Sequence, residues 1–201
     1  MHFLSKPRII ITIGVIIIMS LAVFLYVQRS SFFRKRYIFI DGGAYRGQII
    51  ELFIKTNFYS RHPWEIYAFE PNPGVINEIP KRPNLIILNK ALWSRDEFIK
   101  FYLAGKDVGS SSVVKEKRTG RLNLNEPIEV EAVNFGKWIK RNFKMKDVIL
   151  VNLDIEGAEY EVLQSMLREN TIGYIDELYV EFHNVKVNVS REVDEKLVSA
   201  L

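Results

Sequence analysis

Three apolar, β-branched runs that each end in an acidic residue constrain the fold of this chain more than any other feature. They are YIFIDGG from Tyr37, IYAFEP from Ile66 and VILVNLD from Val148. Runs of this kind predict buried parallel strands, whose carboxyl ends lie along one edge of the sheet. Open α/β sheets bind small ligands at that edge. The pattern therefore predicts an α/β fold with acidic side chains where a ligand binds.

Apolar runs alternate with helical patterns along the chain, which predicts a doubly wound, mostly parallel sheet. The principal strands are expected over residues 37–41, 65–70, 85–92, 148–154 and 177–182, with further sheet over 98–103 and 128–133. Helices are expected over 48–57, 74–78, 158–168 and 191–201, and over 134–143 with Asn134 as N-cap and Trp138 and Ile139 buried. A polar insertion over 106–126, containing GSSS, is expected to be either a functional loop that closes over the site or a disordered segment.

The amino-terminal region contains an apolar run without a charge over residues 9–27. At 1.5 Å per residue this run spans roughly 28 Å, close to the thickness of the hydrocarbon core of a bilayer. We expect a single-pass membrane anchor over residues 1–36 and one domain over 37–201. A cleaved signal peptide and a buried core helix are the alternatives. Two bases precede the run and four follow it, which predicts a cytoplasmic domain.

The net charge of the expected domain argues against a nucleic-acid partner. The chain has 28 Lys and Arg and 24 Asp and Glu, but six of the bases precede Tyr37 and no acid does. The domain therefore has 22 bases against 24 acids, which removes the electrostatic case for binding DNA or RNA. The bases beside the apolar run suit anionic lipid head groups instead. The absence of cysteine excludes disulfides, Cys-ligated zinc and thiol catalysis.

The segment DGGAYRG from Asp41 predicts a tight turn where the backbone can approach a ligand. Its glycines do not match G-x-G-x-x-G, which counts against a dinucleotide site and an NAD-dependent oxidoreductase. Glu70 ends the next strand 23 residues after Gly47, a spacing at which an acidic residue accepts hydrogen bonds from an adenosine ribose. Pro71 and Pro73 then direct the chain away from the sheet. We therefore expect a cofactor that contains adenosine.

A second acidic group follows the strand that starts at Val148. Asn152, Asp154 and Glu156 alternate, so they project to one side if the strand continues that far. Glu159 opens a helix, where an acid can simply complement the helix dipole. His183 ends the last strand and can act as a general base or hydrogen-bond a loop. No group of His, Asp and Glu has the spacing of a metal site, so the sequence names no metal ligand.

The motifs DGGAYRG, AFEPNP, LNKAL, GSSS, LDIEGAEYEVL and EFH, in this order, resemble the FkbM family of S-adenosylmethionine-dependent methyltransferases. The resemblance covers roughly residues 37–183, and the D-x-E-G-A-E core is its most specific part. It implies a Rossmann-like class I methyltransferase fold, S-adenosyl-L-methionine as cofactor and methylation of a hydroxyl oxygen. The implied cofactor-binding residues are Asp41, Gly42, Gly43, Ala44, Gly47, Glu70, Pro71, Asn89 and Ala91, and the implied catalytic residues are Asp154, Glu156 and His183.

Two departures from the family shape the remaining expectations. The chain ends 18 residues after His183, so we expect a sheet without the final antiparallel hairpin. The apolar run at the amino terminus predicts an acceptor associated with membranes, such as a glycan, a glycolipid or a related small molecule. Asp154 or His183 is expected to take the proton from the acceptor hydroxyl. The alternative is a catalytically silent, membrane-tethered module that keeps the fold for binding alone.

Overall fold

The computed structural model describes residues 20–21, 34–105 and 108–201. Its main compact unit runs from Arg36 to Leu201. The predicted membrane span over residues 9–27 lies outside the described residues, except for Ser20 and Leu21, which are helical. Within the described ranges, no helix has both the length and the apolar character that crossing a bilayer requires.

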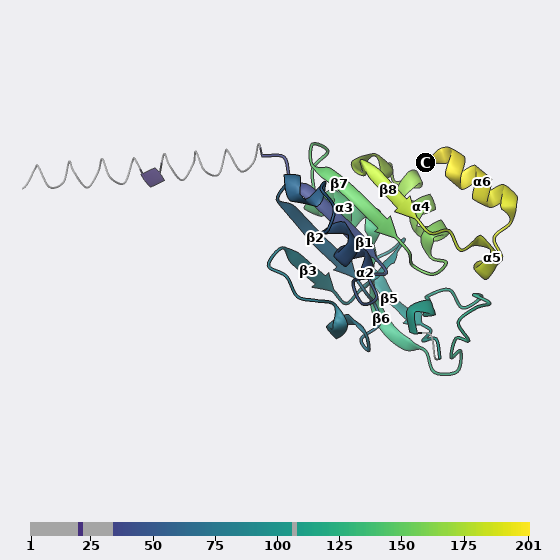
Figure 1. The fold of residues 1–201 in the computed structure, drawn as a ribbon. Coiled ribbons are helices and arrows are strands. Elements are labelled where there is room, and N and C mark those ends of the chain that lie inside the picture. The colour runs from purple at the N-terminus through teal and green to yellow at the C-terminus, as the bar shows by residue number, and fades with distance from the viewer. Residues whose placement is uncertain (1–19, 22–33, 106–107) are drawn as a thin grey trace, which may run out of the picture. The chain divides into compact units, whose positions relative to one another are not determined.

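The central sheet has five parallel strands in the order β3-β2-β1-β7-β8 (Figure 1). Their bounds are β1 Tyr37–Gly42, β2 Trp64–Phe69, β3 Leu85–Leu88, β7 Val148–Leu153 and β8 Glu177–Val180. Strand β1 lies between β2 and β7, and the order of the strands reverses there. A crevice beyond the carboxyl ends of β1 and β7 is therefore a topological switch point, where open α/β sheets bind ligands. This confirms the predicted mostly parallel sheet.

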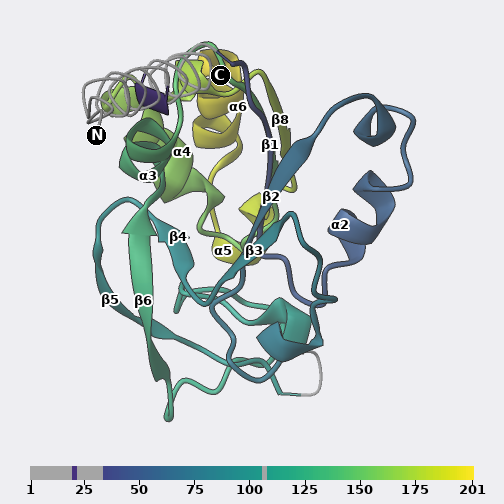
Figure 2. The same ribbon diagram turned by 90° about the vertical axis from the view of Figure 1, so that its left-hand side faces the viewer.

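Alternate residues of β1 belong to two different cores. Ile38 and Ile40 lie in the core beside α3 (Phe135–Asn142) and α4 (Glu159–Arg168), whereas Phe39 lies in the core beside α2 (Gln48–Phe53). Figure 2 shows α3 and α4 on one side of the sheet and α2 on the other. Side chains alternate along a strand, so a sheet covered on both faces requires apolar residues at successive positions. The uninterrupted apolar runs of the sequence follow from this arrangement.

A second sheet has the order β4-β6-β5, formed by β4 (Ala91–Trp93), β5 (Glu97–Phe101) and β6 (Ile128–Asn134). The predicted single strand over residues 85–92 is therefore wrong, because the chain leaves the first sheet after Leu88 and enters the second at Ala91. Asn89 holds the turn between them: its Nδ2 donates to the carbonyl oxygens of Glu70 at 2.8 Å and Pro71 at 3.0 Å. Long-range hydrogen bonds of this kind break an apolar run that looks continuous in sequence.

Helix α3 begins as predicted, since Asn134 Oδ1 accepts a hydrogen bond from the Lys137 N–H at 2.9 Å. Two other predicted helices are shorter than expected. Helix α2 ends at Phe53, whose carbonyl accepts a hydrogen bond from Thr56 Oγ1 at 2.7 Å. The predicted helix over residues 74–78 is a 3₁₀ turn, Ile76–Glu78.

The polar insertion contacts the turn after β7. Ser112 pairs with Tyr102, and its Oγ donates to the carbonyl oxygen of Glu156 at 2.7 Å. The insertion is thus tied to the carboxyl edge of the sheet.

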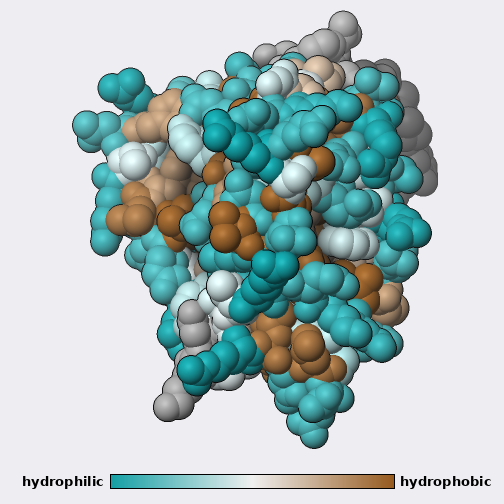
Figure 3. Space-filling view, turned by 90° about the vertical axis from the view of Figure 1, so that its right-hand side faces the viewer, coloured by the Kyte–Doolittle hydropathy of each residue, from teal (hydrophilic) through white to brown (hydrophobic). Residues whose placement is uncertain are grey.

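Residues 181–201, all of them described, form α5 (Asn184–Val187) and α6 (Arg191–Ala200) and no further strand. Figure 3 views the molecule from the side on which α5 and α6 lie in Figure 1, where a largely hydrophilic surface contains separate apolar groups.

Candidate active site

A pocket lies beyond the carboxyl ends of β1, β2 and β7, at the switch point of the sheet. Residues from four segments line it: Gly43 and Tyr45 after β1, Glu70 and Pro71 after β2, Ala91 and Leu92 of β4, and Asp154 and Glu156 after β7. The insertion adds Gly109, Ser111 and Val113. The structure therefore brings Glu70 and Asp154 into one pocket, while Asp41, the third acidic strand end, is buried and is not among the lining residues.

Glu70 is held rigidly at the rim of this pocket. Its Oε2 accepts the Tyr45 N–H at 2.8 Å and its Oε1 accepts the Asn72 N–H at 2.7 Å. Burial raises the pKa of Glu70 to about 7, although these two hydrogen bonds lower it, and the charge of Asp41 raises it further. A carboxylate has about four acceptor positions, so two remain for hydroxyl groups of a ligand.

The glycine turn after β1 is shaped by the neighbouring turn after β7. Gly43 has a φ of +79°, and a Cβ there would lie 1.9 Å from the Asp154 carbonyl oxygen. Gly42 packs against Leu92, Ala44 is buried, and Gly47 caps α2 in the left-handed conformation. Of the glycines in this turn, Gly43 is the one that borders the pocket. The close approach of the two turns places Asp154 beside the predicted cofactor loop.

Asp41 lies beneath this turn and is 1% exposed. Its Oδ1 accepts a hydrogen bond from Asn152 Nδ2 at 2.9 Å. Its Oδ2 has no hydrogen-bond partner within the described part of the chain. Burial raises the pKa of Asp41 to about 6, and the charge of Asp154 adds to this, while the hydrogen bond from Asn152 opposes it. A free, buried acceptor of this kind suits a cationic group on a ligand.

The turn after β7 departs from the predicted alternation. The strand ends at Leu153, and Glu156 adopts a φ of +55°, so Asn152, Asp154 and Glu156 do not project to one side as strand residues. Glu156 Oε2 instead forms ion pairs with Lys117 Nζ at 2.7 Å and Lys186 Nζ at 3.3 Å. The side chain of Lys117 is fully buried, and its ammonium also donates to the Ser110 carbonyl. This ion pair anchors the insertion to the site.

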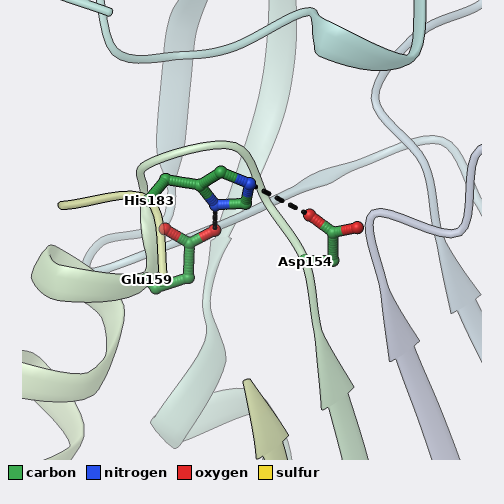
Figure 4. Close-up of side chains that lie close together, drawn as sticks. All are labelled: Asp154, Glu159 and His183. Carbon is green, nitrogen blue, oxygen red and sulfur yellow. Dashed lines mark hydrogen bonds and ion pairs between the residues drawn. The ribbon is translucent and has the colours of Figure 1, made fainter. Parts of the chain in front are cut away.

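Glu159, at the start of α4, organises the same turn. It is fully buried and accepts the N–H groups of Ile155 at 2.9 Å and Gly157 at 2.9 Å. Its Oε1 also lies 3.0 Å from His183 Nδ1. Figure 4 shows the His183 ring between two carboxylates, with Nδ1 toward Glu159 and Nε2 toward Asp154. Glu159 therefore does more than complement a helix dipole.

Asp154 and His183 both have a raised pKa. Burial raises the pKa of Asp154 to about 6, and the charge of Glu181 raises it further, while His183 lowers it. For His183, burial alone would lower the pKa, but the hydrogen bond to Glu159 and the charges of Glu159 and Glu156 outweigh it, so the pKa is raised. Groups whose pKa values move toward neutrality can exchange protons at physiological pH.

The sequence did not reveal two residues that hold the site together. Glu159 carries a weak signal, because it follows a glycine at a strand-to-helix turn. Lys117 carries none: it stands in a polar insertion, 39 residues from its partner Glu156. Of the remaining predicted residues, Ala91 lines the pocket, and Asn89 supports the chain beside it through Glu70 and Pro71.

The fold is a doubly wound parallel sheet with acidic strand ends around its switch point. It belongs to the class of open α/β folds, which bind ligands, nucleotides among them, at this position. The sequence model of the family described as "Methyltransferase FkbM domain" matches residues 41–197. The chain therefore belongs to the FkbM methyltransferase family, as its motifs predict, and this membership supports methyl transfer in general. Comparisons with curated proteins and with solved structures gave no significant match.

Proposed function

We propose that this protein is an S-adenosylmethionine-dependent O-methyltransferase whose acceptor is a hydroxyl group of a sugar, a glycolipid or a related small molecule. The observation that carries the proposal is the position of Glu70: a carboxylate fixed by two main-chain N–H groups at the rim of the switch-point pocket. Family membership supports methyl transfer, and the geometry of the pocket supports this particular donor.

The residues around the pocket fit the donor. Glu70 would accept hydrogen bonds from the two ribose hydroxyls, and the turn around Gly43 would lie against the amino-acid tail. Asp41 Oδ2, buried and without a hydrogen bond among the described residues, offers a negative charge near that turn for the ammonium of the tail. When bound, the donor supplies an electrophilic methyl group on a sulfonium.

Asp154 and His183 are the proposed proton acceptors. Asp154 lines the pocket, and its Oδ1 makes no hydrogen bond with any described residue. His183 Nε2 lies 3.6 Å from that oxygen, and Glu159 holds the opposite side of the ring. An acceptor hydroxyl beside Asp154 would lose its proton to this pair as it attacks the methyl carbon. The insertion, tied down through Lys117, would shield the reacting groups from water.

The acceptor is proposed to be membrane-associated because the apolar run at residues 9–27 would hold the domain at a bilayer. The basic residues beside the run would add attraction to anionic lipids. Both arguments come from the sequence. Both arguments can be tested by mass spectrometry of membrane glycans and lipids from cells with and without the protein. In cells that lack the protein, one glycan or lipid is expected to lack a methyl group.

Calorimetry with the full chain tests the choice of donor. We expect one binding site each for S-adenosylmethionine and for its demethylated product, and no heat with NADH. Glu70→Gln should weaken binding of both, whereas Glu78→Gln, in an exposed ion pair with Arg46, should not. NADH binding in place of S-adenosylmethionine would favour an oxidoreductase and end the proposal.

The role of Asp154 is tested separately from cofactor binding. Asp154→Asn should bind S-adenosylmethionine like the wild type but transfer its methyl group about 100-fold more slowly. Glu161→Gln removes an equivalent carboxylate from an exposed ion pair with Arg168 and should leave the rate unchanged. Full turnover by Asp154→Asn with normal cofactor binding would remove Asp154 from the mechanism.

A further inference from the structure

The Nε2 atom of His183 is buried and faces several carboxylates, but it forms no hydrogen bond with any described residue. The side chain is 1% exposed, and Nε2 has no hydrogen-bond partner within residues 34–105 and 108–201. The nearest carboxylate oxygens are Glu181 Oε1 at 3.4 Å and Asp154 Oδ1 and Glu156 Oε2, both at 3.6 Å. Protein N–H···O bonds measure about 2.7–3.2 Å, so these contacts are too long.

The spacing between these atoms suits two ligands of one metal ion. Imidazole nitrogen and carboxylate oxygen each bind an ion such as Zn²⁺ at about 2.0–2.2 Å, which places neighbouring ligands about 3.0–3.6 Å apart in tetrahedral or octahedral geometry. His183 Nε2 lies within or at the edge of this range from Asp154 and from Glu181. The Glu181 side chain is 64% exposed, so it adds negative charge beside the ring and is not a fixed ligand.

The other nitrogen of the ring is held as in known metal sites. Metal-binding histidines commonly donate the second ring N–H to a carboxylate, which fixes the tautomer and aims the free nitrogen at the metal. Glu159 Oε1 lies 3.0 Å from His183 Nδ1 and is fully buried (Figure 4). Glu159 also accepts two main-chain N–H groups, and it lies on the Nδ1 side of the ring, away from Nε2. It is therefore a positioning residue and not a ligand.

The charges around the ring leave room for a divalent cation. Four carboxylates surround His183, contributed by Asp154, Glu156, Glu159 and Glu181. Two ammonium groups, of Lys117 and Lys186, pair with Glu156. With a neutral imidazole the group carries two uncompensated negative charges. Glu156 and Glu159 are largely buried, whereas Asp154 and Glu181 are 40% and 64% exposed, so a cation of charge +2 would add to the stabilisation that solvent gives the exposed pair.

We propose that His183 Nε2 and Asp154 Oδ1 bind a divalent transition-metal cation, with Glu159 orienting His183. One imidazole and one carboxylate suit Mn²⁺, Fe²⁺ or Zn²⁺. Two protein ligands leave coordination positions open for water or for an oxygen of another molecule. Asp154 also lines the pocket, so the cation would lie at its border. If the proposed methyl transfer is correct, a hydroxyl bound to this cation would lose its proton more readily, and Asp154 Oδ2 would take that proton in place of His183 Nε2.

Metal binding can be measured without donor or acceptor, so its failure is distinct from a failure of the proposed function. The full chain, freed of metal with a chelator, is titrated with Co²⁺ and Mn²⁺. Co²⁺ is followed by its visible absorption and Mn²⁺ by electron paramagnetic resonance. One ion per chain is expected, with a cobalt spectrum that indicates nitrogen and oxygen ligands. S-adenosylmethionine binding is measured in parallel in the chelator.

Variants separate ligands from the positioning residue. Asp154→Asn and His183→Gln should weaken binding about 100-fold, and Glu159→Gln about 10-fold. Glu161→Gln, on the exposed side of the same helix, should bind like the wild type. Asp154→Asn is the more decisive variant, because its side chain is 40% exposed and Oδ1 has no hydrogen bond among the described residues to lose. Absence of a saturable site, or equal binding by wild type and Asp154→Asn, would overturn the proposal.

Discussion

The substitution Glu159→Gln tests whether this buried carboxylate organises the site. Oε1 accepts the Ile155 N–H and contacts His183 Nδ1, and Oε2 accepts the Gly157 N–H. A glutamine amide has one oxygen, so in either orientation its NH₂ group faces a main-chain N–H. The NH₂ group then lies against a buried N–H where a carboxylate oxygen accepted before, and that N–H keeps at best the longer contact that Gly157 makes with Oε1 at 3.2 Å, which costs about 1–3 kcal/mol. For a domain of this size, that loss lowers the melting temperature by about 3–9 °C.

Differential scanning calorimetry of the full chain measures this effect. Glu161→Gln is the matched control, because the same change two residues away affects an exposed pair with Arg168, 3.6 Å long. Exposed ion pairs contribute about 0–1 kcal/mol, so the control should melt close to the wild type. In chelator, NMR should also show a lower pKa for His183 in Glu159→Gln, because the carboxylate that raises it has been removed. If Glu159→Gln melts at the wild-type temperature and its His183 titrates as in the wild type, Glu159 does not organise the site.

Three further predictions address the other supports of the site. Gly43→Ala should either fail to fold or lose about 3 kcal/mol of unfolding free energy in chemical denaturation, because a Cβ at a φ of +79° would meet a carbonyl oxygen at 1.9 Å. Gly173→Ala is the control, because its Cβ would have no heavy atom within 4 Å. Equal losses of stability in both variants would show that the close approach of the two turns does not require glycine at position 43. Lys117→Met should lower the unfolding free energy by about 3 kcal/mol, because it breaks a buried ion pair. Lys137→Met breaks a more exposed ion pair and should lower it little. Similar melting temperatures for both variants would show that the Lys117 pair does not stabilise the insertion. Glu70 has a pKa raised to about 7, so its carboxylate form is lost as the pH falls. Glu70 should therefore raise the dissociation constant of S-adenosylmethionine about tenfold from pH 8 to pH 6, and Glu70→Gln should keep only the roughly twofold rise expected from Asp41, whose pKa is about 6. An equal rise in both proteins would assign the effect to another group.

The strands of the central sheet could be predicted because their burial leaves a direct trace in the sequence. A strand covered on both faces needs apolar residues at most positions in succession, and β1, β2 and β7 show this pattern, each with one polar residue. The break between β3 and β4 could not be predicted in the same way. It depends on the Asn89 side chain, which hydrogen-bonds to carbonyls 18 and 19 residues earlier in the chain. The length of α2 likewise depends on local hydrogen bonds that an apolar pattern does not record.

The site could be predicted in outline and not in detail. Parallel strands bring their carboxyl ends together, so the positions of Glu70 and Asp154 at one edge follow from the topology. The contacts of His183 do not follow from it, because its ring meets Asp154 from 29 residues away and Glu159 from 24. A lysine in a polar insertion is normally exposed, so nothing in the sequence marks Lys117 as buried. These contacts depend on how the loops pack.

A crystal structure of the full chain with S-adenosylmethionine, or with its demethylated product, shows whether the switch-point pocket binds the donor. We expect the ligand in the pocket beyond β1, β2 and β7, with both ribose hydroxyls within hydrogen-bond distance of the Glu70 carboxylate. The sulfur would point toward Asp154. A ligand bound elsewhere, or a ribose that does not contact Glu70, would show that Glu70 does not hold the donor.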